Sequence, residues 1–157
     1  MPNLHPSENA FALARKFEGL RLSVYNDPSS LPTIGYGHRL THEEAASIHT
    51  ITQDEAESLL ASDMEIAARA VNDAGDFACN QNQFDALCAF VFNLGGARFV
   101  NSSLLDHLES GNYEQAADDL LLWCHAHAGI RLVELPGLFA RRTAERELFL
   151  SGTVPNK

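Results

Sequence analysis

A short segment rich in glycine and turn-forming residues interrupts an otherwise helical pattern, and it restricts the fold more than any other feature. Residues 20–25 form a strand-like run, and residues 26–30 read Asn-Asp-Pro-Ser-Ser, which is typical of a turn. Residues 33–38 read Thr-Ile-Gly-Tyr-Gly-His and indicate a second strand, whose glycines allow close approach of another backbone. We expect a small β lobe between helices.

Helices are predicted on both sides of this segment. Ser7 can cap a first helix that stops at Gly19, which places Glu18 in its last turn. A capping box at residues 52–55 opens a long helix that ends near residue 75. The remaining predicted helices run over residues 82–94, about 102–108, 113 to about 123, and 138–150.

These patterns predict one α+β domain, mainly α, over residues 1–157. The β lobe is expected over roughly residues 19–50, the joining helix over 52–75, and the helical lobe over 80–152 together with the N-terminal helix. Three cysteines, Cys79, Cys88 and Cys124, show neither zinc nor disulfide spacing. Cys88 lies in an apolar run that suits a buried free thiol.

The charge of the chain excludes one class of function. A formal net charge of -10 argues against general nucleic-acid binding, which needs a positive surface. Seven acidic residues crowd the central stretch 54–76, which we interpret as a solvated helix face. We see no signal peptide at the N-terminus and no apolar run long enough to span a membrane.

Two carboxylates from different elements form the best candidate catalytic pair. Glu18 closes a helix and Asp27 lies in a turn, so the two can face each other across a groove. Cleavage of a glycosidic bond needs a proton donor and a second carboxylate that activates water or attacks carbon. Thr33 adds a hydroxyl that can hold a water. Because the chain has 21 acidic residues, this pairing alone does not identify an activity.

The sequence around the pair closely resembles the phage-type lysozymes of glycoside hydrolase family 24. In that family a Glu in an E-G motif, an Asp nine residues later and a Thr six residues further on form the catalytic set, and Glu18, Asp27 and Thr33 match both intervals. The T-I-G-Y-G-H string makes the match specific. Residues 51–63, 83–95 and 137–145 resemble three further family motifs, in the family's order.

The resemblance implies a lysozyme-like fold with a cleft between the two lobes, and a muramidase activity. Glu18 would protonate the oxygen that leaves from the β-1,4 bond between N-acetylmuramic acid and N-acetylglucosamine, in bacterial peptidoglycan. Asp27 and Thr33 would position water on the opposite face, with inversion. Arg141 aligns with a family arginine that pairs with the catalytic Glu, and such a pair favours the charged form of Glu18.

Further residues and partners follow from the same resemblance. Asn93, Tyr36 and Arg141 are the candidate substrate-binding residues, although Asn93 can also cap a helix and Arg141 can be structural. We expect no cofactor and no metal, and a monomer that acts on peptidoglycan strands without nucleic acid or membrane. The enzyme is expected to be made in the host cytoplasm and to reach the cell wall after release.

The sequence departs from the family pattern at three places. Ser30 stands where the family usually has Gly, so the turn before Thr33 can differ in shape. The stretch 125–135 fits the pattern poorly, and His125-x-His127 beside Cys124 lacks a matched fourth metal ligand, so we interpret it as a polar loop. The acidic total is unusual for a wall-degrading enzyme, and it would slow approach to an anionic wall if it lies away from the cleft.

Other functions remain open at this stage. A fold can outlive its chemistry, so the chain can be an inactive muramidase-like module that binds a protein partner. The retention of all three catalytic residues argues against that interpretation. A hydrolase of chitin-like chains would share the fold and the site. A secreted wall-degrading toxin and a phage enzyme of host lysis would look alike in sequence.

Overall fold

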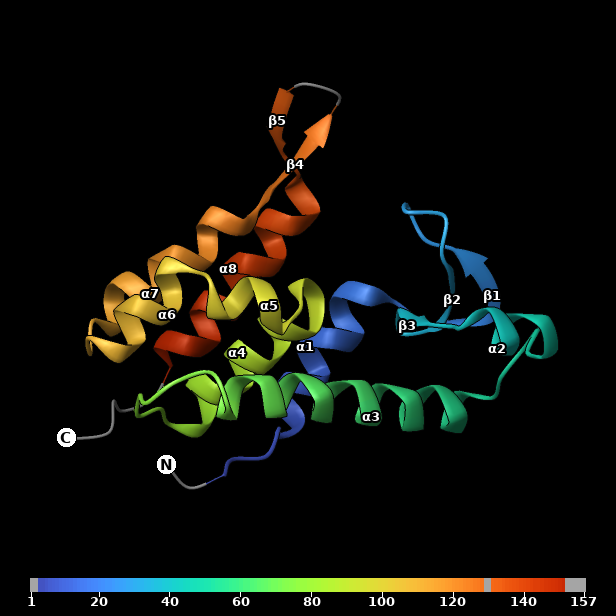
Figure 1. Cartoon of the computed structure of the whole chain (residues 1–157), viewed down its shortest axis with the longest axis horizontal. Coiled ribbons are helices and arrows are strands. Elements are labelled where there is room, and N and C mark those ends of the chain that lie inside the picture. The colour runs from blue at the N-terminus through green and yellow to red at the C-terminus, as the bar shows by residue number, and fades with distance from the viewer. Residues whose placement is uncertain (1–2, 129–130, 152–157) are drawn as a thin grey trace.

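The helical and β-forming segments separate into two lobes, which one long helix joins (Figure 1). The computed structural model describes residues 3–128 and 131–151, with side chains described outside residues 126–132. The elements are α1 (Glu8–Glu18), β1 (Arg21–Asn26), β2 (Pro32–Gly35), β3 (His38–Arg39), α2 (His42–Ser47), α3 (Gln53–Asn72), α4 (Gln81–Leu94), α5 (Gly96–Val100), α6 (Ser103–Glu109), α7 (Tyr113–Leu120), η1 (Leu121–Trp123), β4 (His125–Ala128), β5 (Arg131–Glu134) and α8 (Pro136–Leu150). The predicted mainly helical α+β class is confirmed.

Helix α1 comes first in the sequence but packs in the helical lobe. Its buried residues Ala10 and Ala14 belong to the hydrophobic core, α1 contacts α4, and its cap residue Ser7 donates its backbone N–H to Asp85 Oδ1 at 2.8 Å. The small alanine side chains allow the two helices to approach closely. The helix ends at Gly19, which has a φ of 70° and donates its N–H to the Arg15 carbonyl, as predicted.

The β lobe contains a three-stranded antiparallel sheet in the order β1-β2-β3. The sequence predicted a single second strand over residues 33–38, and this prediction is wrong. The strand ends at Gly35 and turns back through Gly37 into β3, because both glycines adopt positive φ angles, 65° and 89°. The short helix α2, which the sequence analysis did not predict, follows this hairpin.

Helix α3 begins with the predicted capping box, in which Thr52 and Glu55 exchange side-chain and backbone hydrogen bonds. It runs along the lower edge of Figure 1 from the β lobe to the helical lobe. Helix α4 begins one residue earlier than predicted, with Asn80 as its cap. It packs against α1, α3 and α8 at the centre of the helical lobe.

The core of the molecule lies around α4. Phe90 makes edge-to-face contacts with Phe99 and Trp123, at ring-centroid distances of 6.4 and 5.8 Å. Cys88 is fully buried as predicted, and all three cysteines are free thiols. Within the described ranges, no helix combines the length and apolarity needed to cross a membrane.

Residues 125–128 and 131–134 form two paired strands, where the sequence analysis predicted a polar loop. Strands β4 and β5 pair antiparallel, with His125 opposite Glu134. Strand β4 reads His-Ala-His-Ala, which alternates polar and apolar residues, but four residues are too few to distinguish a strand from a loop. The two strands project away from the core in Figure 1. The side chain of His127, part of the predicted polar loop, lies outside the described side chains.

Candidate active site

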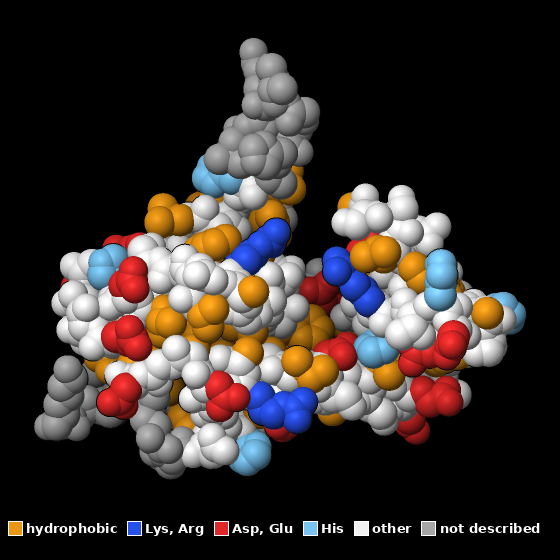
Figure 2. Space-filling view, viewed as in Figure 1, with side chains coloured by type: hydrophobic (Ala, Val, Ile, Leu, Met, Phe, Trp, Pro, Cys, Tyr) orange, Lys and Arg blue, Asp and Glu red, His pale blue; other side chains and the backbone are white. Residues whose placement is uncertain are grey.

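A cleft of about 830 Å³ separates the β lobe from the helical lobe. Figure 2 shows it as a hollow with acidic side chains inside and basic side chains on both rims. Residues of β1, the following turn, β2 and β3 form one wall, α3 forms the floor, and α4 and α5 form the other wall. Its lining includes Glu18, Tyr25, Asp27, Thr33, Gly37, His38, Arg39, Asp63, Ile66, Asn93 and Arg98. The three predicted catalytic residues are therefore brought together.

Glu18 reaches the cleft from the last turn of α1. One carboxylate oxygen, Oε1, accepts a hydrogen bond from Arg141 Nη1 of α8. The other oxygen lies against Gly37, where an added Cβ would come within 3.2 Å of Glu18 Oε2. About a quarter of the side chain (23%) remains exposed. The carboxylate is thus held on one side and open to the cleft on the other.

Asp27 lies in the turn between β1 and β2, and its two oxygens have different partners. Oδ1 accepts the backbone N–H groups of Ser29 and Leu31 at 2.8 and 2.9 Å, and Oδ2 accepts Arg39 Nη2 at 3.2 Å. These bonds, that from Leu31 first, lower the pKa of Asp27 from its ordinary value. Asp27 is therefore held as a carboxylate, and Oδ2 keeps capacity to accept a further hydrogen bond.

Thr33 lies on β2, where its side chain is buried at the cleft wall (2% exposed). Its hydroxyl donates to the Leu31 carbonyl at 3.0 Å. The donor proton is thereby used within the protein, so the hydroxyl oxygen can face the cleft only as an acceptor. Leu31 therefore orients both residues, through its N–H to Asp27 and its carbonyl to Thr33.

The predicted substrate-binding residues occupy different places. Asn93 lines the cleft, and its Oδ1 accepts Arg142 Nη2 at 2.6 Å, which leaves the amide N–H groups available to a ligand. Arg141 is 4% exposed and reaches the cleft only through Glu18. Tyr36 is buried, does not line the cleft, and donates its hydroxyl to Glu57 Oε1 at 2.8 Å. We therefore withdraw Tyr36 as a sugar contact, because its polar end is bound to α3.

A buried group of charges on α8 lies behind Glu18. Arg141 donates from Nε to Glu145 Oε1 at 3.1 Å, and Arg142 Nη1 lies 3.2 Å from Glu145 Oε2. Arg142 and Glu145 are fully buried, and burial raises the pKa of Glu145 to about 7 and lowers that of Arg142 to about 10. Glu145 thus holds Arg141 in the position from which it contacts Glu18.

A second network of hydrogen bonds joins the C-terminal half of α1 to α3, the helix that forms the floor of the cleft. Arg15 donates to both oxygens of Glu57 on α3, at 2.8 to 3.2 Å, and Tyr36 donates to the same carboxylate. The Arg15 bonds hold the pKa of Glu57 below its ordinary value. Since Arg15 lies about one turn before Glu18 in α1, this network helps to fix the position of Glu18 in the cleft.

Sequence reasoning missed several cleft residues. Arg39 forms an ion pair with Asp27. His38 Nδ1 lies 2.8 Å from Asp63 Oδ2, so this pair connects β3 to α3. Arg39 was missed because the sequence analysis predicted one strand over residues 33–38, whereas β2 and β3 form a hairpin that pairs Arg39 with Thr33. The cleft lining includes Asp63 of α3, so part of the acidity of this helix lies at the cleft and not away from it.

Within the described part of the chain, one group of side chains has the composition and spacing of a metal site. It consists of Cys124, His125 and Glu134 at the base of the β4–β5 hairpin, and none of the three lines the cleft. The cleft chemistry described above rests on carboxylates, hydroxyls and amides of the chain itself.

Comparison with known proteins identifies the family of the chain. The phage lysozyme family profile matches residues 15–145. The chain is 38% identical over 148 residues to the endolysin of Acyrthosiphon pisum secondary endosymbiont phage 1, an alignment that covers 94% of this chain and 99% of that protein. It is also 38% identical over 147 residues to the endolysin of Salmonella phage P22, covering 92% and 97% of the two chains.

Among solved structures, the muramidase domain of SpmX from Asticaccaulis excentricus superposes with a TM-score of 0.86 and 33% identity, over 94% of this chain and 99% of that one. Fold, sequence profile and relatives agree, and they confirm the resemblance that the motifs indicated. The chain belongs to the phage lysozyme family.

Proposed function

We propose that this protein is a muramidase that cleaves the β-1,4 bond between N-acetylmuramic acid and N-acetylglucosamine in peptidoglycan, in phage-induced lysis of the host. The observation that carries the proposal is the convergence of Glu18, Asp27 and Thr33 on one cleft. Membership of the phage lysozyme family, with endolysins among its relatives, supports peptidoglycan as the substrate.

Glu18 is the proposed general acid. Its carboxyl would donate a proton to the leaving glycosidic oxygen, and its ion pair with Arg141 would stabilise the carboxylate that results. Binding of the sugar would also exclude water from the cleft around this carboxyl.

Asp27 and Thr33 are the proposed water-positioning pair. The acceptor capacity of Asp27 Oδ2 and of Thr33 Oγ1 would bind the two hydrogens of one water. That water would attack the anomeric carbon from the face opposite Glu18 and transfer one proton to Asp27. The negative charge of Asp27 also favours the oxocarbenium-like transition state. Asn93 would contact the sugar through its free amide N–H groups.

Glu18→Gln tests the proposal, because it removes the proton donor and keeps the shape. General acid–base groups contribute about 10²–10⁴-fold, so clearing of purified peptidoglycan should fall at least about a hundredfold with the fold retained. Glu147→Gln is the matched control, since Glu147 is exposed on α8 and should leave activity unchanged.

Product analysis of the same digests identifies the bond. A muramidase leaves N-acetylmuramic acid at the new reducing end, and inversion gives the α-anomer first. Products that end in N-acetylglucosamine would refute the proposed bond specificity. A Glu18→Gln protein that keeps more than about a tenth of the clearance would refute the catalytic assignment, since a lost general acid costs more than that.

The alternative of an inactive binding module makes the opposite prediction. Wild-type protein would then bind peptidoglycan or a protein partner without releasing soluble fragments. Chitin oligomers, offered beside peptidoglycan, test the third possibility: a chitin-type hydrolase would cleave chitin faster than peptidoglycan, and a muramidase would cleave peptidoglycan faster.

A further inference from the structure

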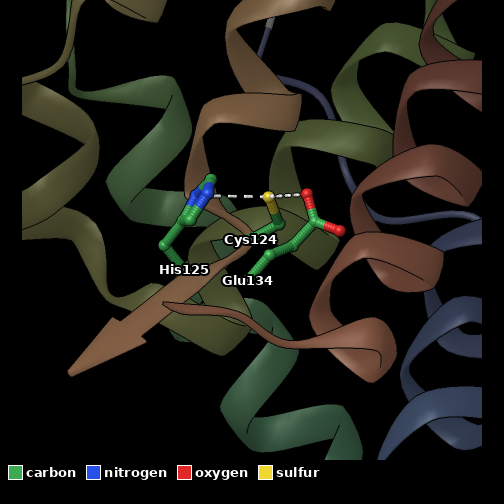
Figure 3. A group of neighbouring side chains, drawn as sticks. All are labelled: Cys124, His125 and Glu134. Carbon is green, nitrogen blue, oxygen red and sulfur yellow. Dashed lines mark hydrogen bonds between the residues drawn. The ribbon is translucent and has the colours of Figure 1, made fainter. Parts of the chain in front are cut away.

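Three side chains with metal-binding chemistry meet at the base of the β4–β5 hairpin, outside the cleft (Figure 3). Cys124 follows η1, His125 begins β4, and Glu134 ends β5. The antiparallel register places His125 opposite Glu134, and the Leu135 N–H donates to the Cys124 carbonyl at 2.9 Å. The backbone of the hairpin therefore fixes the relative positions of the three residues.

The conformation of Cys124 brings its thiol to the same side as its neighbour. Successive side chains of an extended strand point to opposite faces. Cys124 has a φ of -102° and a ψ of 5°, so it is not extended, and its Sγ lies 3.4 Å from His125 Nδ1. The same sulfur lies 3.7 Å from Glu134 Oε2.

These distances resemble those between the ligand atoms of a small tetrahedral ion. With Zn–S near 2.3 Å and Zn–N and Zn–O near 2.0–2.2 Å, tetrahedral geometry separates ligand atoms by roughly 3.3–3.6 Å. The two sulfur distances are close to this range, and all three ligand atoms lie within 4.8 Å of one another. The side chains of His125 and Glu134 are exposed, so they can rotate to close the remaining gap.

We propose that Cys124, His125 and Glu134 form a binding site for a divalent zinc-class cation, with Sγ, Nδ1 and a carboxylate oxygen as ligands. Thiolate and imidazole select borderline ions such as Zn²⁺ over Mg²⁺ and Ca²⁺, which prefer oxygen. Three protein ligands leave a fourth position for water. The sulfur is buried (2% of the residue is exposed), whereas His125 and Glu134 offer the ion a path from solvent.

The position of the site indicates a structural role. The ion would cross-link the start of β4 to the end of β5, two residues before Pro136 opens α8. Helix α8 carries Arg141, which holds Glu18. An ion at this place would therefore stabilise the junction between the hairpin and the helix, without entering the cleft. The sequence analysis expected no metal because it found no matched fourth ligand beside Cys124, His125 and His127. It did not consider Glu134, which comes from the opposite strand.

Burial raises the pKa of the Cys124 thiol, and the Glu134 carboxylate beside it raises that pKa further. In the metal-free protein the sulfur is therefore a neutral thiol that donates a hydrogen bond to Glu134. This hydrogen-bonded chain, with no affinity for metal, is the alternative that the experiment must separate from a metal site.

Titration of the metal-free protein with Co²⁺ tests the site directly. Cobalt bound to a thiolate absorbs in the near ultraviolet by charge transfer, and tetrahedral cobalt absorbs in the visible. We expect both signals to saturate at one equivalent. Cys124→Ser should abolish the charge-transfer signal, and Cys79→Ser should retain it, because Cys79 is a free thiol outside the group.

Two further variants keep the test valid if Cys124→Ser does not fold. His125→Gln and Glu134→Gln change exposed side chains, and each should weaken Co²⁺ and Zn²⁺ affinity by at least about tenfold. Zn²⁺ at a hundredfold excess over its Kd should raise the Tm of wild type by about 5–10 °C. Absence of the charge-transfer signal in wild type, or unchanged affinity in both variants, would overturn the proposal.

Discussion

At the scale of single residues, the ionisation of Asp27 is set by its immediate neighbours. The backbone N–H of Leu31, the N–H of Ser29 and the Arg39 guanidinium all favour its charged form. A folded-state pKa below the ordinary value means that Asp27 loses its charge only as pH falls through that lowered value. Asp27 is therefore ionised near neutral pH, where the proposed hydrolysis takes place.

Replacing Arg39 by Gln should raise the pKa of Asp27, because a positive charge and one hydrogen bond are removed while the two backbone bonds remain. Carbon-13 NMR titration of the Asp27 carboxyl measures this shift, and the acidic limb of the pH–rate profile on short glycans should move up with it. Arg98→Gln is the control, since Arg98 lines the cleft but has no contact with Asp27 among those described. An identical titration in both variants would contradict the assignment of Arg39.

Ser30 carries a conformational cost in the same turn. It has a φ of 62°, the sole positive φ of a non-glycine residue in the described chain. The left-handed region costs an L-residue about 1–2 kcal/mol, so Ser30→Gly should stabilise the protein by about 0.5–1 kcal/mol after the added freedom of the unfolded chain. Urea unfolding measures the difference. Ser29→Gly, without a positive φ to relieve, should destabilise, and a gain of equal size there would contradict the explanation.

At the scale of elements, helix α8 places the buried charges of Arg141, Arg142 and Glu145 in the interior. Glu145→Ala would leave the buried Arg142 without its carboxylate and free Arg141 Nε, so we expect a loss of about 3–5 kcal/mol in the free energy of unfolding. Glu147→Ala, an exposed change on the same helix, should cost less than about 0.5 kcal/mol. Denaturant melts of the three proteins measure this, and equal midpoints would show that the buried pair adds no stability.

Local signals account for what could be predicted from the sequence, and long-range partners account for what could not. Ser7, Gly19 and the Thr52 capping box mark element ends within a few residues, so α1 and α3 were predicted well. Glu18, Asp27 and Thr33 lie within one short stretch of family motif, and their catalytic roles stay predictions. Tyr36 was misassigned because its partner, Glu57, lies on a different element.

The hairpin and its side chains show the same limit. Strands β4 and β5 are four residues each, which is too short for the alternation in β4 to distinguish a strand from a loop. The proximity of Glu134 to Cys124 depends on which residue of one strand faces which residue of the other. The register cannot be read from the composition of either strand.

At the scale of the whole molecule, net charge opposes approach to the substrate. The chain carries -10, and bacterial walls are often anionic, so moderate salt should speed clearing of intact peptidoglycan. Screening length falls from about 10 Å at 0.1 M to about 3 Å at 1 M salt. Turnover of short neutral chitin oligomers should change little, because they carry no charge. A salt titration on both substrates measures the contrast.

If added salt instead slows wall clearing, two basic side chains of the cleft explain the result. Arg39 and Arg98 stand on the cleft wall and present positive charge to an incoming strand. Wall clearing that falls steadily from the lowest salt upward would mean that these two side chains, and not the net charge, govern docking. The catalytic assignment would be unaffected.

The side chain of Asn82 links the first helix, α1, to the residue that follows the last helix, α8, and this link has a consequence for folding. Asn82 accepts a hydrogen bond from Asn9 Nδ2 at 3.3 Å and donates one to the Ser151 carbonyl at 2.9 Å. Because α1 also packs against α4 and α8, the β lobe is an insertion between α1 and the rest of the helical lobe. The helical lobe is complete only when these distant segments of the chain meet. A circular permutant that joins these ends and opens before α3 would make the helical lobe continuous, lower its contact order, and let it fold ahead of an appended β lobe.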